Sequence, residues 1–83
     1  MLVQVNVNFY SYLKDLTGCA QVTETLPDDS TLDTLFQQLT TRFPKLGPVR
    51  KSILMAVGLD YQDRKYRLKE GDEVSLFPPV QGG

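Results

Sequence analysis

Histidine is absent from the 83-residue chain, and cysteine occurs once, at Cys19. A Ser-His-Asp triad, a Cys-His pair and the usual zinc sites need side chains that this chain lacks. A lone thiol also excludes a disulfide within the chain, and we expect Cys19 to be structural and not a carrier of sulfur. No glycine-rich nucleotide loop is present. The sequence therefore predicts a protein that is not an enzyme by itself and that holds no metal and no bound cofactor.

Long apolar runs are also missing. No stretch approaches the 18 or more apolar residues of a membrane span, and no basic-then-apolar leader precedes the first strand pattern. The net charge of −1 gives no overall field that would attract nucleic acid or a membrane. With 41% apolar and 23% charged residues, the chain is typical of a single soluble domain. We expect a cytoplasmic protein without nucleic-acid or membrane partners.

Charge is nevertheless uneven along the chain. Residues 1–41 carry a net charge of −4, whereas residues 42–69 carry +6. This basic middle could steer an acidic partner toward the protein, although a solvated surface is the commoner outcome. The cations considered for steering are Arg50, Lys51, Arg64, Lys65 and Arg67.

Two strands open the chain. Residues 2–9 alternate apolar and polar side chains, which predicts a strand with one buried face. Residues 20–26 predict a second, antiparallel strand with Ala20, Val22 and Leu26 facing inward, and Glu24 is its one awkward member. Between the strands, the sequence predicts a short helical turn that stops at Gly18.

One clear helix follows. Its apolar stripe has the period of an amphipathic helix and consists of Leu32, Leu35, Phe36, Leu39 and Phe43. Ser30 is predicted to cap the helix, with Asp33 completing a capping box, and Pro44 is predicted to end it.

The second half of the chain reads as strands joined by connectors. Residues 44–52 form a basic connector with Gly47-Pro48 as a breaker. Residues 53–57 are continuously apolar, which predicts a strand covered on both faces. Residues 62–68 should be irregular or a short edge strand, and residues 73–77 alternate again as the last strand.

This order of elements predicts an α+β fold of the β-grasp kind. A mixed, four- to five-stranded sheet would wrap around one main helix, whose stripe packs on the inner face. We expect a β-grasp domain over residues 1–77 and a flexible tail over residues 78–83 that ends in Gly-Gly.

The tail has an unusual composition. Pro78 and Pro79 favour an extended path, whereas Gly82 and Gly83 have no side chain and contribute little to a fold. A slim end of this kind suits a carboxylate that must enter another protein's active site. A frayed terminus would have the same composition.

Three stretches carry a resemblance to a known family. Phe9-Tyr10-Ser11 with Lys14-Asp15-Leu16 and Gly18 is the first, and Ala56 to Tyr61 is the second, with Gly58 where the family usually has asparagine. The third runs from Leu68 to Val74 and on through Phe77-Pro78-Pro79-Val80-Gln81-Gly82-Gly83. In these stretches the chain resembles the ubiquitin-like sulfur carriers, and among them most closely the small subunits of molybdopterin synthase.

The resemblance implies a sulfur donor that is not itself a catalyst. In such proteins an adenylating enzyme of the ubiquitin-activating type uses Mg-ATP to activate the terminal carboxylate, here that of Gly83. Persulfide sulfur then converts it to a thiocarboxylate, which enters the large synthase subunit and gives its sulfur to precursor Z in molybdenum cofactor biosynthesis. The residues expected to contact partners are Phe77, Pro78, Pro79, Val80, Gln81 and Gly82, together with exposed apolar residues of the outer sheet face.

Three alternatives stay open at the level of the sequence. A thiamine-pathway sulfur carrier shares the chemistry and the Gly-Gly end. A ubiquitin-like modifier would join lysines after the same adenylation. A β-grasp binding module that carries no sulfur would keep its partner when the tail is removed.

Overall fold

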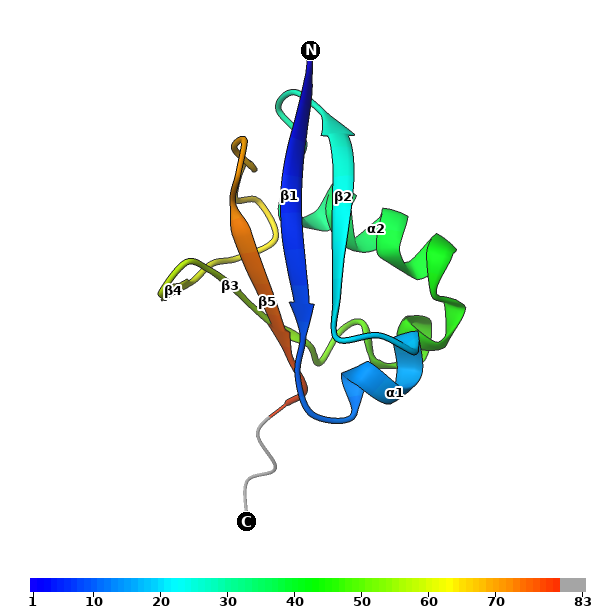
Figure 1. The fold of residues 1–83 in the computed structure, drawn as a ribbon. Helices are drawn as coiled ribbons and strands as arrows, with labels where there is room; N and C mark the ends of the chain where they lie inside the picture. The colour runs from blue at the N-terminus through cyan, green and yellow to red at the C-terminus, as the bar shows by residue number, and fades with distance from the viewer. Residues whose placement is uncertain (80–83) are drawn as a thin grey trace.

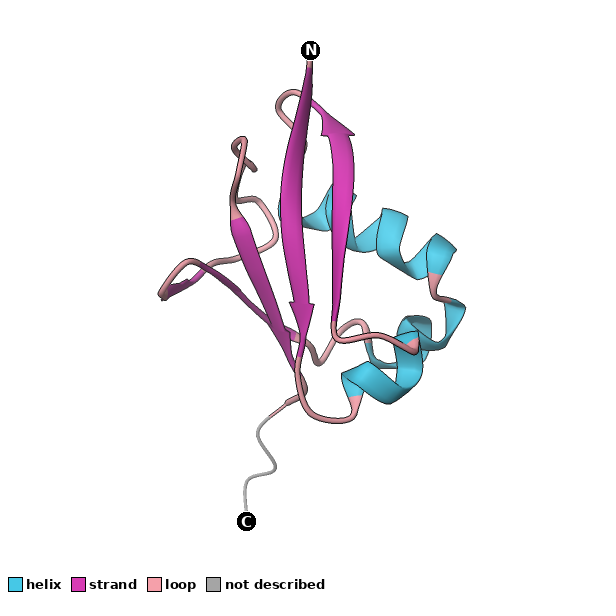
Figure 2. Ribbon diagram, in the orientation of Figure 1, coloured by secondary structure: helices cyan, strands magenta, loops and turns pink. Residues whose placement is uncertain are grey.

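The computed structural model describes residues 1–79. Within them the chain forms a mixed five-stranded sheet in the order β2-β1-β5-β3-β4, with the helices packed on one side of the sheet (Figures 1 and 2). The elements are β1 (Leu2–Phe9), α1 (Leu13–Thr17), β2 (Gln21–Pro27), α2 (Leu32–Arg42), the 3-10 helix η1 (Pro44–Val49), β3 (Leu54–Val57), β4 (Asp60–Tyr61) and β5 (Glu73–Phe77). The predicted α+β β-grasp architecture is confirmed.

β1 is the second strand of the sheet and lies between β2 and β5. Its alternation buries Val3, Val5, Val7 and Phe9 against the helices. It pairs antiparallel with β2 and parallel with β5, so that Val7 lies between Val22 and Val74 in the register. Because β1 and β5 are parallel, both strands end at the same edge of the molecule.

α2 supplies the other half of the core. Leu32, Leu35, Phe36 and Leu39 are at most 1% exposed, as the predicted stripe requires. The predicted cap is wrong by one residue: the N-cap is Thr31, whose side-chain oxygen accepts the Thr34 N–H. The Ser30 hydroxyl instead donates to the Pro27 carbonyl at 2.7 Å and closes the preceding turn.

The first turn of α2 is also held by a distant segment. The amides of Leu32 and Asp33 donate to the carbonyls of Tyr66 and Arg64, each at 3.0 Å. These amides have no partner within their own helix. The segment between β4 and β5 is thereby fixed against the start of α2.

One member of the inward set predicted for β2 is wrong. Ala20 is exposed and precedes the strand, so it is not an inward residue. Glu24 does face inward and is only 4% exposed. Its carboxylate forms an ion pair with Arg42 and accepts a hydrogen bond from Gln38 at 3.1 Å, so both partners come from α2.

Two further predictions, one for the connector after α2 and one for β3, are wrong. Gly47-Pro48 does not break the connector, because both residues belong to η1; a 3-10 turn at this point accommodates the proline. The strand at residues 53–57 is not covered on both faces either, since Leu54 is 37% exposed. The helices occupy only the inner side of the sheet, so an outward residue of β3 remains accessible (Figure 2).

Candidate docking site at the end of β5

The last strand is placed to lead the chain out of the fold. β5 lies between β1 and β3, and Val74 and Leu76 anchor it with fully buried side chains. It ends at Phe77, and Pro78 and Pro79 follow as half-buried residues outside any strand. The remaining predicted site residues, Val80, Gln81, Gly82 and Gly83, lie outside the described residues.

Phe77 belongs to an aromatic cluster and not to the core. Its strand neighbours face inward, so its half-buried ring lies on the outer face of the sheet. The ring stacks on Tyr10 with centroids 4.8 Å apart and an interplanar angle of 12°, and the Tyr61 ring meets it edge-on at 6.2 Å. The Tyr10 amide donates to the Leu76 carbonyl at 3.2 Å. Three distant parts of the chain therefore meet at the base of the tail.

Parallel pairing explains this meeting. β1 and β5 end together, which places Tyr10, the residue after β1, beside Phe77. β3 runs antiparallel to β5, so its first residue, Leu54, pairs directly with Phe77. Tyr10, Leu54, Tyr61 and Phe77 form what we term the aromatic patch.

The aromatic patch is accessible in the isolated chain. Tyr10 is 44% exposed and Tyr61 is 69% exposed, beside the partly exposed Leu54. A group of large apolar side chains that rim one strand end is typical of a protein-interaction surface. The sequence predicted that exposed apolar residues of the outer sheet face would lie near Phe77, and the structure identifies them as Tyr10, Leu54 and Tyr61. Sequence reasoning gave Tyr10, Leu54 and Tyr61 no such role, although Tyr10 and Tyr61 stand in the stretches that carry the family resemblance.

A groove of about 580 Å³ adjoins the aromatic patch and shares Leu54 and Tyr61 with it. It runs between β3 and the segment that follows β4. Its lining residues are Ile53, Leu54, Met55, Tyr61, Gln62, Asp63 and Arg64.

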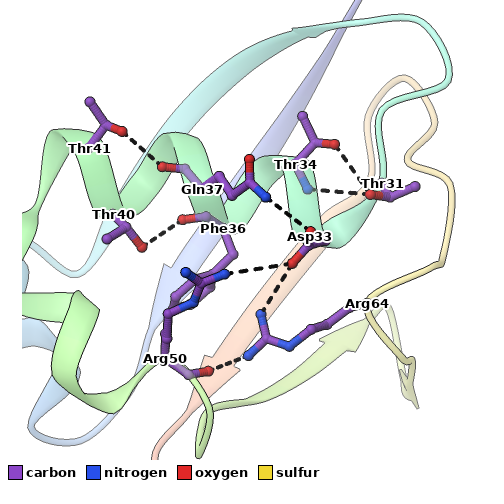
Figure 3. A network of polar contacts seen from close by, with 9 residues as sticks. All are labelled: Thr31, Asp33, Thr34, Phe36, Gln37, Thr40, Thr41, Arg50 and Arg64. Atoms are coloured by element: carbon purple, nitrogen blue, oxygen red, sulfur yellow. Dashed lines mark hydrogen bonds and ion pairs between the residues drawn. The ribbon is translucent and has the colours of Figure 1, made fainter.

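A polar network fixes one wall of the groove (Figure 3). The Arg64 guanidinium lies 3.7 Å from Asp33 and donates a hydrogen bond to the Arg50 carbonyl. It also lies over the Phe36 ring, 5.2 Å from its centroid, a cation–π arrangement. Arg50 approaches the same Asp33 carboxylate at 4.0 Å. Arg64 therefore lines the groove and at the same time contacts α2 and Arg50, the residue that follows η1.

The network also changes the interpretation of the basic middle segment. Arg50 and Arg64 share the Asp33 carboxylate, and Arg67 lies 3.9 Å from Asp29. Three of the five cations considered for steering are therefore within ion-pair distance of carboxylates of the same chain. Lys51 and Lys65 form no ion pair within residues 1–79.

Residues 1–79 contain no cluster of three or more side chains suited to a metal ion. In the same part of the chain, none of the helices combines the length and apolar character needed to cross a membrane. Cys19 is half-buried, with its Sγ 3.8 Å from the Thr17 hydroxyl oxygen. Its structural role stays a prediction.

Comparison with known proteins gives a consistent result across nearly the whole chain. Residues 7–83 match the model of the ThiS family. Proteins named molybdopterin synthase sulfur carrier subunit are 33% identical in Homo sapiens, over 99% of this chain and 97% of the relative, and 31% identical in Chlamydomonas reinhardtii, over 98% and 100%.

Solved structures agree on the fold. A Pyrococcus furiosus protein assigned as molybdopterin converting factor, subunit 1, superposes with a TM-score of 0.87 at 26% identity, covering 94% of this chain and 99% of that one. The small archaeal modifier protein SAMP1 of Haloferax volcanii superposes with a TM-score of 0.85 at 23% identity, over 96% and 99% of the two chains. The second likeness supports the β-grasp fold alone.

Proposed function

The chain belongs to the ThiS family, and from this membership we propose that it is the sulfur carrier subunit of a molybdopterin synthase, with Gly83 as the residue that carries the sulfur. Relatives of this name match nearly end to end, and this match carries the proposal. A small synthase subunit implies a large subunit as its partner. The described part of the chain fits a donor role, because its one exposed aromatic cluster stands at the base of the tail.

The proposed chemistry begins at the Gly83 carboxylate. A carboxylate is a poor electrophile until one of its oxygens becomes part of a good leaving group. In the proposal, an adenylating enzyme binds Mg-ATP, the carboxylate attacks the α-phosphate and displaces pyrophosphate, and an acyl adenylate forms. The outer sulfur of a cysteine persulfide then displaces AMP and forms an acyl disulfide. A second thiol cleaves that disulfide, is itself oxidised to a disulfide with the donor cysteine, and releases the thiocarboxylate. Glycine suits this position since it has no side chain to hinder attack at its carbonyl.

The fold contributes position and not catalysis. Pro78 and Pro79 restrict the backbone directly after β5, and the Tyr10–Phe77 stack fixes the last residue of the strand. We propose that partners bind the aromatic patch while residues 80–83 enter their active sites. In this division of labour the activating enzyme and the large subunit perform the catalysis, and this chain supplies the reacting group.

Top-down mass spectrometry tests the sulfur-carrier role. The chain is expressed together with its adenylating enzyme and a sulfur donor, and one oxygen-to-sulfur exchange is sought in the fragment that contains Gly83. Fragment location is essential because oxidation of Met1, Cys19 or Met55 adds nearly the same mass. Gly83→Ala should fold normally and remain unloaded. A plain carboxylate in the wild-type chain, with active enzyme and donor present, would contradict the proposal.

The second half of the experiment tests the pathway. The loaded chain is mixed with the large synthase subunit and precursor Z, and formation of the dithiolene product is measured. Loading without product would leave a sulfur carrier of another pathway. Attachment to lysines of other proteins would indicate a ubiquitin-like modifier.

A further inference from the structure

We propose that the groove between β3 and residues 61–64 is a second anchoring site for the large synthase subunit, separate from the tail. It would take one apolar side chain of that subunit, with an acidic residue next to it. This inference rests on the proposed function and extends it from the tail to a surface that is already shaped in the isolated chain.

The length of the tail places the groove inside the partner's footprint. Six residues follow Phe77, and at about 3.3–3.6 Å per extended residue they span at most roughly 20 Å. A subunit whose active site receives Gly83 must therefore lie close to the end of β5. Leu54 pairs directly with Phe77, and paired strands are about 4.8 Å apart. The groove thus begins one strand away from the point where the tail leaves.

The lining of the groove favours an apolar occupant. Four lining residues are apolar: Ile53 and Met55 are core residues that are each only 5% exposed, and Leu54 and Tyr61 are accessible. Leu54 and Tyr61 also belong to the aromatic patch, so the two surfaces are continuous. One partner can cover both without leaving an uncovered strip between them.

Two lysines stand close to lining residues of the groove in the sequence. Lys51 precedes the lining residue Ile53 by two positions, and Lys65 directly follows Arg64. Neither lysine is ion-paired within residues 1–79. Asp63 is the one carboxylate in the lining, and the Arg64 guanidinium in the same lining carries the opposite charge. Counted together with Lys51 and Lys65, these side chains have a net positive charge, which is complementary to an acidic neighbour of the inserted side chain.

The groove is also preformed. Arg64 is held through Asp33, the Arg50 carbonyl and the Phe36 ring, and the same segment bonds to the first turn of α2. A wall held in this way loses little conformational entropy on binding.

Affinity measurements on the full chain test the proposal. Binding of the large subunit is measured by titration calorimetry for wild type, Leu54→Arg and the control Leu59→Arg. Leu59 is a fully exposed leucine in the turn between β3 and β4 and does not line the groove. We expect Leu54→Arg to weaken binding at least about tenfold, as for a central interface residue, and the control to bind like wild type. Circular dichroism melts confirm that both variants fold.

A second pair of variants separates the groove from the aromatic patch. Gln62 lines the groove but lies outside the patch, and both changes keep its approximate size. Because the expected occupant is acidic, Gln62→Glu should bind more weakly than Gln62→Lys, by about threefold or more at low salt, and the difference should shrink as salt is added. Equal affinities of the two variants would overturn the proposal even if Leu54→Arg binds weakly.

Sulfur loading provides the last discrimination. Gln62→Glu should be thiocarboxylated by the adenylating enzyme at the wild-type rate, since Gln62 lines the groove assigned to the large subunit and lies outside the aromatic patch. An equal loss of loading and of large-subunit binding would overturn that assignment. If wild type itself fails to bind the large subunit, the proposed function falls and this inference falls with it. If wild type and Leu54→Arg bind equally well, only the inference falls.

Discussion

Arg42 is predicted to be worth more to stability than any other cation on the surface of the described chain. Its partner Glu24 is 4% exposed and faces the core side of β2. Arg42→Gln removes the guanidinium and keeps a side chain of moderate size. The Glu24 carboxylate then stays buried with only the Gln38 amide, 3.1 Å away, as a hydrogen-bond donor.

The expected cost follows from the burial of the two partners. Breaking a fully buried ion pair by removing one partner costs about 3–5 kcal/mol. The Arg42 side chain is 52% exposed, so water already screens part of the attraction. Gln38 retains part of the hydrogen bonding. We therefore expect the free energy of unfolding to fall by about 2 kcal/mol, which lowers Tm by roughly 8–16 °C in a domain of this size.

Urea unfolding followed by far-UV circular dichroism measures this change. Arg67→Gln is the matched control, because its ion pair with Asp29 is 76% and 82% exposed and should contribute little. The double variant Glu24→Gln/Arg42→Gln should be more stable than Arg42→Gln alone, since no buried charge is left unpaired. If Arg42→Gln is as mild as the Arg67 control, the burial argument for Glu24 is wrong. Sulfur loading of folded Arg42→Gln should be normal, as the pair lies outside the aromatic patch and the groove.

Three further predictions concern other parts of the fold. Tyr10→Ala should weaken binding of the large subunit at least about fivefold by removing the stack on Phe77, while Tyr10→Phe restores it; equal binding of the two variants would refute a role for the stack. Gly18→Ala should destabilise the chain by about 1 kcal/mol in urea unfolding, because its φ is +79°, whereas Gly47→Ala, whose new Cβ would meet a methyl group at an ordinary 3.7 Å, should be close to neutral. Burial, aided by the hydrogen bond to Asp72, raises the pKa of Tyr66 above its usual 10.0, so the unfolded state loses this proton first and stability falls as pH rises above 10. Tyr66→Phe should therefore lose less stability than wild type between pH 9 and 11; parallel pH profiles would contradict this.

The spacing of apolar residues along the sequence was sufficient to predict most of the fold. The alternation in β1 and the stripe of α2 depend on local spacing, and both predicted faces are buried except at Phe43, which is half-buried at the C-cap of α2. The Pro44 stop and the turn at Gly18 are also local effects of backbone geometry, and both hold. Chain order alone then restricts the packing of one helix against a small mixed sheet to few arrangements.

Long-range contacts account for what the sequence did not predict. Glu24 appeared awkward because its partner, Arg42, lies 18 positions away on α2. Leu54 stands in a continuous apolar run, and nothing local distinguishes an outward residue from a buried one there. The clustering of Tyr10, Tyr61 and Phe77 depends on the parallel pairing of β1 with β5, which a linear pattern does not encode. The N-cap of α2 was predicted one residue too early because serine and threonine both cap helices well and Ser30 directly precedes Thr31.

The central position of β5 has a consequence for how the protein is made. β5 is the last of the described strands to leave the ribosome, yet β1 and β3 both need it as their neighbour. The hairpin of β1 and β2 can pair early, but two strands alone are only marginally stable. The sheet therefore closes after residues 73–77 have been synthesised, within six residues of Gly83. A chain that stops before β5 cannot complete the sheet and becomes a substrate for proteolysis. Only chains that have been synthesised through β5, and so almost to Gly83, can therefore complete the sheet.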